Sequence, residues 1–201
     1  KTTSFLFKRL TEAAGLTLLV LSVLLLISLI SYSPEDPNFI FPEKTEINNL
    51  LGAKGSYASD ILYQSIGLIS LLVPISFMLI SVSVMFNKKI LHIIEGFFFV
   101  ILYSIVGTLF FTMFHTETYW LTINGNNGFI GNLFEETFLI DFIKLNKQIS
   151  YIVLIFLIII LFLLSINFKF KYLKSITLIF SDSKNKTNNI IINNIDENLN
   201  N

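Results

Sequence analysis

Residues 13–37 read AAGLTLLVLSVLLLISLISYSPEDP, an uncharged apolar run that stops at two prolines and an acidic pair. The uncharged part is long enough to cross a bilayer, which takes about 20 residues of helix. Proline lacks a backbone N–H and disfavours the helical conformation of the residue before it, so the helix is expected to end here. Tyrosine suits the headgroup layer and the acidic pair suits water. We name this segment the exit turn; it comprises Ser31, Tyr32, Ser33, Pro34, Glu35, Asp36 and Pro37.

Three more stretches lack charged residues over a comparable length. The four predicted spans lie at about 13–33, 61–86, 96–115 and 148–168. Each is expected to be a helix, because a lone helix satisfies its own backbone hydrogen bonds in lipid and a lone strand does not. Hydrophobic residues make up 53% of the chain and charged residues 14%, which is unusual for a soluble domain. The predicted fold class is all-α, an integral membrane four-helix bundle formed by 13–180.

The distribution of lysine and arginine predicts the side of the membrane on which each loop lies. Positive residues favour cytoplasmic loops, and most of them fall in the terminal segments and in the loop between the second and third spans. Both termini are therefore predicted to be cytoplasmic, with 1–12 as a cytoplasmic N-terminus and the two long loops outside. The predicted cytoplasmic residues are Lys1, Lys8, Arg9, Lys88, Lys89, Lys169, Lys171, Lys174, Lys184 and Lys186, and the outer ones are Lys44, Lys54, Lys144 and Lys147.

The second outer loop carries apolar residues at helical spacing. Between Phe129 and Phe142, several apolar positions recur three or four residues apart among Glu135, Glu136 and Asp141. This pattern predicts a short amphipathic helix on the outer leaflet. A loop packed over the top of the bundle fits the same residues equally well.

Small and hydroxyl-bearing residues recur on the third span. Ser104, Thr108 and Thr112 lie four residues apart with Gly107 beside them, so another helix can approach this face closely. One interpretation is an interface between copies of the chain. The interpretation that we favour is helix packing within one four-helix subunit.

No predicted span carries an acidic or basic residue near its centre. Proton and ion pathways depend on such residues, so the pattern argues against a pump or a carrier of charged substrates. Pro74 predicts a kink in the second span near mid-membrane. We interpret that kink as structural, since no polar partner stands near it in the sequence.

The chain shows no pattern typical of catalysis or cofactor binding. The lack of cysteine excludes disulfides and thiolate metal sites, and His92 and His115 have no partner at metal-ligand spacing. Gly125, Gly128 and Gly131 form a glycine loop whose spacing is not a nucleotide fingerprint. We interpret it as a turn at which the backbone approaches another segment closely. We therefore predict no enzyme activity, cofactor or metal for this chain.

The last segment, 181–201, is rich in asparagine and poor in clustered apolar residues. It cannot bury enough apolar surface to fold alone, so we predict the disordered start of a cytoplasmic linker. An AT-rich genome would also raise the asparagine, lysine, isoleucine and phenylalanine content, so asparagine alone is not taken as a functional signal.

Three motifs resemble the amino-terminal membrane region of the FtsK/SpoIIIE family of DNA translocases. They are the exit turn with Leu29 and Ile30 before it, Asn49-Leu50-Leu51-Gly52 ahead of the second span, and Asn124-Gly125-Asn126-Asn127-Gly128-Phe129-Ile130-Gly131 ahead of the fourth. The resemblance implies an anchor in the bacterial inner membrane, enriched at the division septum. A cytoplasmic linker would join it to a hexameric, ATP-driven motor, absent from this chain, that moves DNA during cell division and chromosome partition.

The resemblance also implies the partners. They would be membrane lipid, other division-site proteins and further copies of the chain, with DNA bound only through the absent motor. The anchor would tether the motor and raise its effective concentration for assembly. Two other classes stay open: a small multipass transporter or channel subunit, which would need polar groups or broken helices at mid-membrane, and a stand-alone structural membrane protein.

Overall fold

The computed structural model describes residues 2–38, 46–87, 90–115, 121 and 123–168, and every regular element within them is a helix. Four helical segments are long and apolar enough to span a membrane. They are Phe5–Ile30, Gly52–Phe86, Leu91–Phe114 and Lys147–Ser165. The predicted all-α fold with four spans is thereby confirmed. The predicted linker, 181–201, lies outside the described residues.

The first span is α1 (Thr2–Ile30), which ends directly before the exit turn, as its prolines predict. After Glu12 it carries no charged residue and is apolar on every side, which suits a helix that faces lipid over most of its surface. Its main packing partner is α3 (Leu72–Asn87), and at that contact Gly15 lies against Met85.

The second span consists of α2 (Gly52–Ile66), a single 3₁₀ segment η1 (Gly67–Leu71) and α3. The break lies at Gly67, whose φ is +67°, and not at Pro74, where the sequence places it. Pro74 instead stands in the first turn of α3, a position at which the missing N–H of proline is tolerated. The expected kink is therefore present with a different cause.

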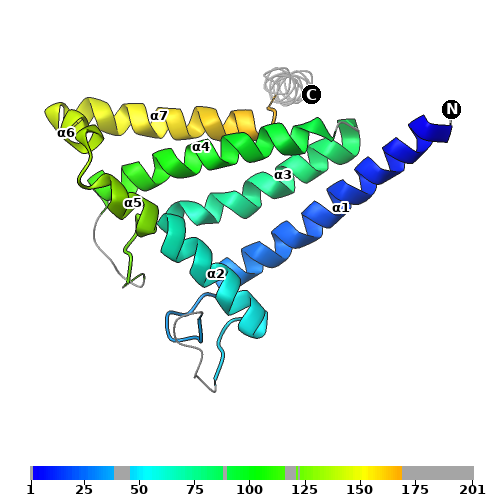
Figure 1. The fold of residues 1–201 in the computed structure, drawn as a ribbon, viewed down its shortest axis with the longest axis horizontal. Coiled ribbons are helices and arrows are strands. Elements are labelled where there is room, and N and C mark those ends of the chain that lie inside the picture. Colours follow the sequence, from blue (N-terminus) through cyan, green and yellow to red (C-terminus); the bar gives the residue numbers. More distant parts are fainter. Residues whose placement is uncertain (1, 39–45, 88–89, 116–120, 122, 169–201) are drawn as a thin grey trace, which may run out of the picture. The chain divides into compact units, whose positions relative to one another are not determined.

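The helix of this span begins at Gly52, well before the predicted start at 61. The predicted boundary depends on the charge of Asp60, but Asp60 is buried and accepts a hydrogen bond from Tyr32. At standard rises η1 and α3 together measure about 34 Å, which already exceeds a hydrocarbon core of about 30 Å. Figure 1 shows α2 set at an angle to α3, so α2 is an addition to the crossing segment.

The remaining spans are α4 (Leu91–Phe114) and α7 (Lys147–Ser165), which pack against each other, and α4 also packs on α3. Figure 1 shows α3, α4 and α7 side by side. Their shared core also receives Leu18 and Leu25 from α1. The buried residues at its centre are Ile69, Val73, Ile80, Val84, Val100 and Tyr103. Helices α1 and α4 finish, and helices α2 and α7 start, at the same end of this bundle. We call it the long-loop end.

Two short helices, α5 (Gly128–Phe134) and α6 (Phe138–Leu145), stand where the sequence predicts one amphipathic helix. Figure 1 views α6 nearly along its axis while α7 runs across the view, so α6 lies across the start of α7. Ile140 and Ile143 form its buried face, and Ile143 packs with Phe110 and Leu154.

Candidate functional site

The exit turn is built around a buried carboxylate. Asp36 is 4% exposed, and its two oxygens accept the backbone N–H groups of Asn48 and Asn49, each at 2.8 Å. Hydrogen bonds to an ionised acceptor are stronger than neutral ones. The expectation that both acids of the turn enter water therefore holds for Glu35, which is exposed, and is wrong for Asp36. A carboxylate tolerates burial when its oxygens are satisfied in this way.

Asn49 joins the end of α1 to the start of α2. Its side-chain amide donates to the Ser28 carbonyl at 2.9 Å and to the Ser31 carbonyl at 3.3 Å. The last carbonyls of a helix lack partners within the helix, so this amide satisfies the end of α1. Its carbonyl oxygen accepts the N–H of Leu51 at 3.1 Å. Two of the three motifs singled out in the sequence thus meet at one residue.

The start of α2 closes this contact from the other side. Ser56 donates to the Pro37 carbonyl and Ser28 donates to the Gly55 carbonyl, both at 2.6 Å. A Cβ atom on Gly55 would overlap the side chain of Asn49, so no larger residue fits there. The exit turn and the first turns of α2 therefore form one packed unit.

A second group of polar side chains lies one turn further along α2. The Tyr32 hydroxyl and the Gln64 amide both donate to one oxygen of Asp60 at 3.3 Å, and the Tyr63 hydroxyl donates to the Leu29 carbonyl at 3.1 Å. Burial, reinforced by the negative charge of Asp60, raises the pKa of Tyr32 to about 12. Tyr32 therefore stays protonated and remains a donor. We call this group, with the residues around Asp36, the exit cluster: Ser28, Ser31, Tyr32, Asp36, Asn49, Ser56 and Asp60.

The glycine loop packs against the break in the second span. The N–H of Leu68 donates to the Asn126 carbonyl at 2.9 Å. A Cβ atom on Gly67 would overlap that same carbonyl, and one on Gly128 would stand 2.5 Å from the backbone nitrogen of Gly67. The two segments therefore touch through their backbones, and we call this contact the glycine junction.

Gly131 and the stripe on α4 complete the junction. A Cβ atom on Gly131 would lie 2.7 Å from the Thr112 hydroxyl oxygen, which accepts a hydrogen bond from the Asn127 amide at 3.2 Å. Gly125 has a φ of +71° and turns the chain before the loop reaches this contact.

The other residues of the α4 stripe are buried inside the subunit. Gly107 packs on Ile69 of η1. The hydroxyls of Ser104 and Thr108 donate to carbonyls of their own helix at 2.7 and 2.8 Å. The stripe therefore lies where two other segments approach α4: the break in the second span at Gly67, and the glycine loop.

Several residues of these contacts have no role assigned in the sequence interpretation. Asn126 and Asn127 are 6% and 7% exposed, and Asn124 donates to the Gln64 side chain at 3.0 Å. In the sequence these asparagines cannot be told apart from those expected of an AT-rich genome. The residue that could have indicated the contact is Gly67, because an isolated glycine inside an apolar run often marks a break or a close approach of backbones.

These contacts position backbone segments, and the described residues hold no group of three or more His, Cys, Asp or Glu side chains able to bind a metal ion. On α4, the hydroxyls of Ser104, Thr108 and Thr112 each donate to a carbonyl of their own helix, so this row also serves packing.

A family model described as the 4TM region of DNA translocase FtsK/SpoIIIE matches residues 7–177. A protein of Rickettsia bellii named DNA translocase FtsK is 46% identical over 48 residues, which are 24% of this chain and 6% of the relative. Its namesake in Azospirillum brasilense is 38% identical over 68 residues, 33% of this chain and 11% of the relative. In Rickettsia prowazekii the identity is 34% over 65 residues, 32% and 9% of the two chains. The matches thus cover a small part of these relatives, and no solved structure matches the chain.

Proposed function

The chain belongs to the family of the 4TM region of the DNA translocases FtsK/SpoIIIE and is a multi-pass membrane domain, and from this premise we propose that it anchors a DNA translocase at the division septum. In this proposal the chain lies in the bacterial inner membrane with both termini in the cytoplasm. A linker connects it to an ATP-driven motor beyond this chain. The motor binds DNA and forms the hexamer, and other division-site proteins bind the anchor.

The family match over residues 7–177 carries the proposal, because it covers all four spans and both loops of the long-loop end. A membrane anchor confines the motor to one surface and raises its effective concentration for assembly. This role requires a stable bundle and no transport pathway.

The distribution of charge supports a tether over a transporter. In the described helices, the charged residues of the segments that cross the bilayer lie near the helix ends: Lys8, Arg9 and Glu12 in α1, Glu95 in α4 and Lys147 in α7. Asp60 lies in α2, which precedes the crossing segment, and is hydrogen-bonded to Tyr32. Charged groups at mid-membrane would be expected of an ion or proton pathway.

A fluorescent fusion of this chain, expressed in dividing bacteria, tests the targeting. We expect a band at the septum, whereas a control four-span protein of unrelated sequence should label the envelope evenly. An even signal from both fusions would contradict septum targeting.

The tethering is tested separately, by the mass of the native polypeptide purified from source membranes. We expect a species far heavier than 23.0 kDa with peptides of a nucleotide-binding loop. A native polypeptide close to that mass would contradict the motor and favour a stand-alone membrane protein.

A further inference from the structure

Two cavities meet at Lys147, the first residue of α7. The first has a volume of about 480 Å³ and is lined by Phe114, Lys147, Gln148, Tyr151 and Ile152. The second has a volume of about 400 Å³ and is lined by Thr112, Met113, Glu135, Ile140, Lys144 and Lys147. Both volumes are typical of small-molecule sites, which lie in the range of about 300–1,000 Å³.

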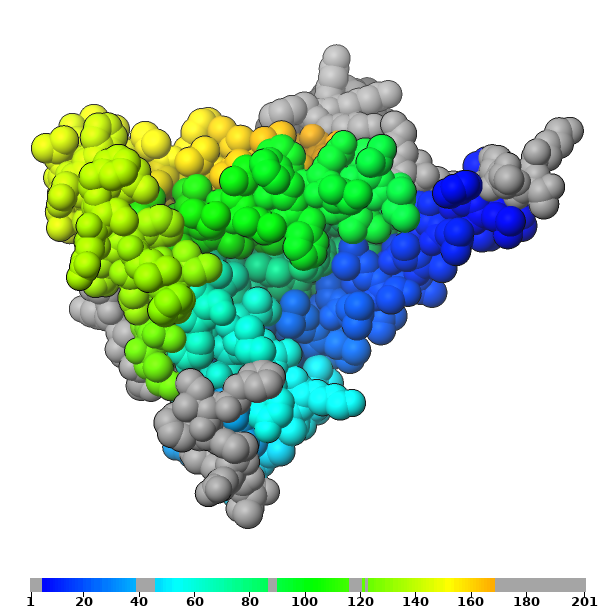
Figure 2. Space-filling model, viewed as in Figure 1, coloured from blue at the N-terminus to red at the C-terminus, as the bar shows by residue number. Residues whose placement is uncertain are grey.

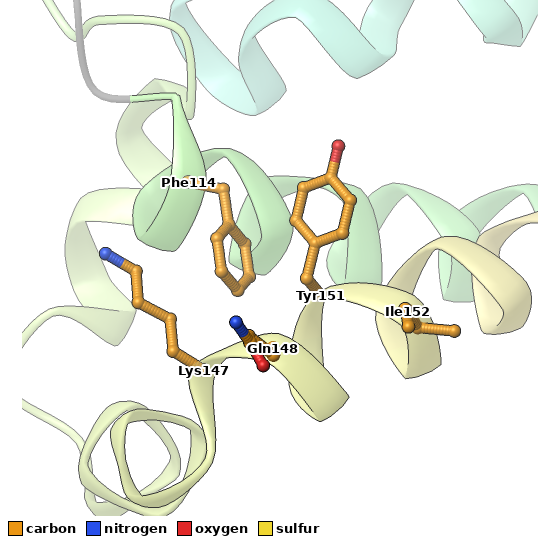
Figure 3. Close-up of a pocket in the computed structure, with 5 residues that line it drawn as sticks. All are labelled: Phe114, Lys147, Gln148, Tyr151 and Ile152. Atoms are coloured by element: carbon orange, nitrogen blue, oxygen red, sulfur yellow. The ribbon is translucent and has the colours of Figure 1, made fainter.

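The first cavity is mainly apolar. The rings of Phe114 from α4 and Tyr151 from α7 meet edge to face, with centroids 5.0 Å apart. Figure 3 shows the Lys147 side chain extending past the Phe114 ring, and its Nζ atom lies 6.0 Å from the ring centroid. The cavity therefore combines an aromatic wall, suited to a hydrocarbon chain, with one cation at its edge.

The second cavity carries an excess of positive charge. Lys144 and Lys147 line it with one acid, Glu135. Lys144 also stands 3.9 Å from Asp141, which does not line the cavity; both side chains are mostly exposed, so solvent screens their attraction and the Lys144 ammonium is held only weakly. No ion pair joins Lys147 to a carboxylate in the part of the chain that the structure describes. Two ammonium groups with up to three donors each suit a phosphate ester.

The position of the two cavities matches the boundary between headgroups and acyl chains. Phe114 ends the third span and Lys147 begins the fourth. Beside them, α6 lies across α7 (Figure 1). Its most exposed apolar side chains are Phe138, Phe142 and Leu145, at 79%, 71% and 81%. Such a helix is stable with its exposed apolar face in the membrane interface. In Figure 2, α5 and α6 form a continuous surface with the adjoining end of α4.

We propose that the junction of α4, α6 and α7 binds one phospholipid molecule, which we name the lipid site. Lys144 and Lys147 hold the phosphodiester, and an acyl chain lies in the cavity between Phe114, Tyr151 and Ile152. The net charge of the site favours an anionic headgroup over a zwitterionic one. This binding is independent of any motor or division-site partner.

Native mass spectrometry of the purified chain in detergent, titrated with phosphatidylglycerol, tests the proposal. We expect one lipid to be retained, and the double substitution Lys144→Gln with Lys147→Gln to raise its apparent Kd at least tenfold. The matched control is Lys54→Gln, since Lys54 is an exposed lysine of the same bundle end that lines neither cavity and should leave the Kd unchanged. A second variant, Ile152→Trp, fills the apolar cavity at a position that is 68% exposed and should weaken binding without a change of charge.

Four outcomes would overturn the lipid site. The double variant retains phosphatidylglycerol as well as the wild type does, although circular dichroism shows both are folded. Phosphatidylcholine binds as tightly as phosphatidylglycerol, so the lysines do not select the headgroup. Glycerol 3-phosphate displaces the lipid at equal concentration, which would make this a site for free phosphate esters. Finally, Ile152→Trp leaves the Kd unchanged, so no acyl chain lies in the cavity.

Discussion

Asp36 and Asn49 are joined by a 2.8 Å hydrogen bond from the backbone N–H of Asn49 to the Asp36 carboxylate, although the two residues lie thirteen positions apart in the chain. The side-chain amide of the same asparagine donates a hydrogen bond to the Ser28 carbonyl near the end of α1. The acidic pair after the first span therefore does more than end the helix. Asp36 fixes the chain that leads into α2, and Glu35 faces solvent.

The first prediction concerns this carboxylate. We expect Asp36→Asn to lower the free energy of unfolding by about 1–3 kcal/mol, because the new amide can accept only one of the two N–H groups and turns its own donors toward the other. Chemical denaturation in detergent micelles measures this change. Glu35→Gln is the control, since an exposed side chain without such bonds should change stability by no more than about 0.5 kcal/mol. Equal effects of the two substitutions would show that the Asp36 bonds contribute no stability.

The second prediction concerns the glycine junction. We expect Gly67→Ala to destabilise the fold by about 2–4 kcal/mol, for two reasons. An alanine at a φ of +67° and a ψ of −148°, a region that essentially only glycine occupies, costs about 1–3 kcal/mol. Its Cβ atom would also displace the Asn126 carbonyl, which accepts the Leu68 N–H, and a lost hydrogen bond adds about 1 kcal/mol.

Gly52→Ala separates the two causes. Gly52 also has a positive φ, +63°, but a Cβ atom there would meet nothing within 4 Å. Its substitution should therefore carry only the cost of a positive φ, about 1–2 kcal/mol. If Gly67→Ala were no more destabilising than Gly52→Ala in the same denaturation experiment, the contact with the glycine loop would contribute nothing.

The sequence predicts the number of spans and the end of α1 because both follow from the need to keep charge and proline out of a membrane helix. It predicts the second span less well, since Asp60 is tolerated inside α2 once Tyr32 and Gln64 donate to it. The bond from Gln64 is local, four residues along the helix, but the bond from Tyr32 joins residues 28 positions apart, which no local sequence pattern indicates.

The candidate site shows the same limit. Gly125, Gly128 and Gly131 mark a close approach in the sequence, but the segment that approaches, at Gly67, is found only in three dimensions. Proline is the stronger breaker by propensity, which favours Pro74 as the cause of the kink. In the fold Pro74 occupies the first turn of α3, so the positive φ of Gly67 makes the break instead.

The third prediction tests whether the stripe on α4 packs within one subunit. A Cβ atom on Gly107 would lie 2.9 Å from the Cβ atom of Ile69, which is closer than the roughly 3.5–4.5 Å of a disulfide, so the bond forms once the two segments move slightly apart. The chain has no cysteine, so Ile69→Cys with Gly107→Cys introduces one defined pair. After mild oxidation we expect an intrachain bond, seen as faster migration in non-reducing electrophoresis.

A matched pair, Ile69→Cys with Ile105→Cys, controls for random collision. Ile105 is 38% exposed and lies about 200° around the helix from Gly107, so it should not reach Ile69. Disulfide-linked dimers as the main product of the Gly107→Cys pair would instead favour an interface between copies of the chain.

The fourth prediction follows from the raised pKa of Tyr32. The unfolded chain loses this proton near pH 10.0 and the folded chain near pH 12, so between these values the unfolded state binds fewer protons. The stability that Tyr32 contributes is therefore fully present below pH 10 and is lost as the pH rises toward 12.

We expect Tyr32→Phe to reduce the slope of unfolding free energy against pH in this window, measured in detergent. Asp60→Asn keeps the hydroxyl but removes the charge that helps to raise the pKa, so its slope should lie between those of the wild type and Tyr32→Phe. An unchanged slope in Tyr32→Phe would mean that this hydroxyl titrates alike in the folded and unfolded chain, and that burial in the exit cluster does not hold its proton.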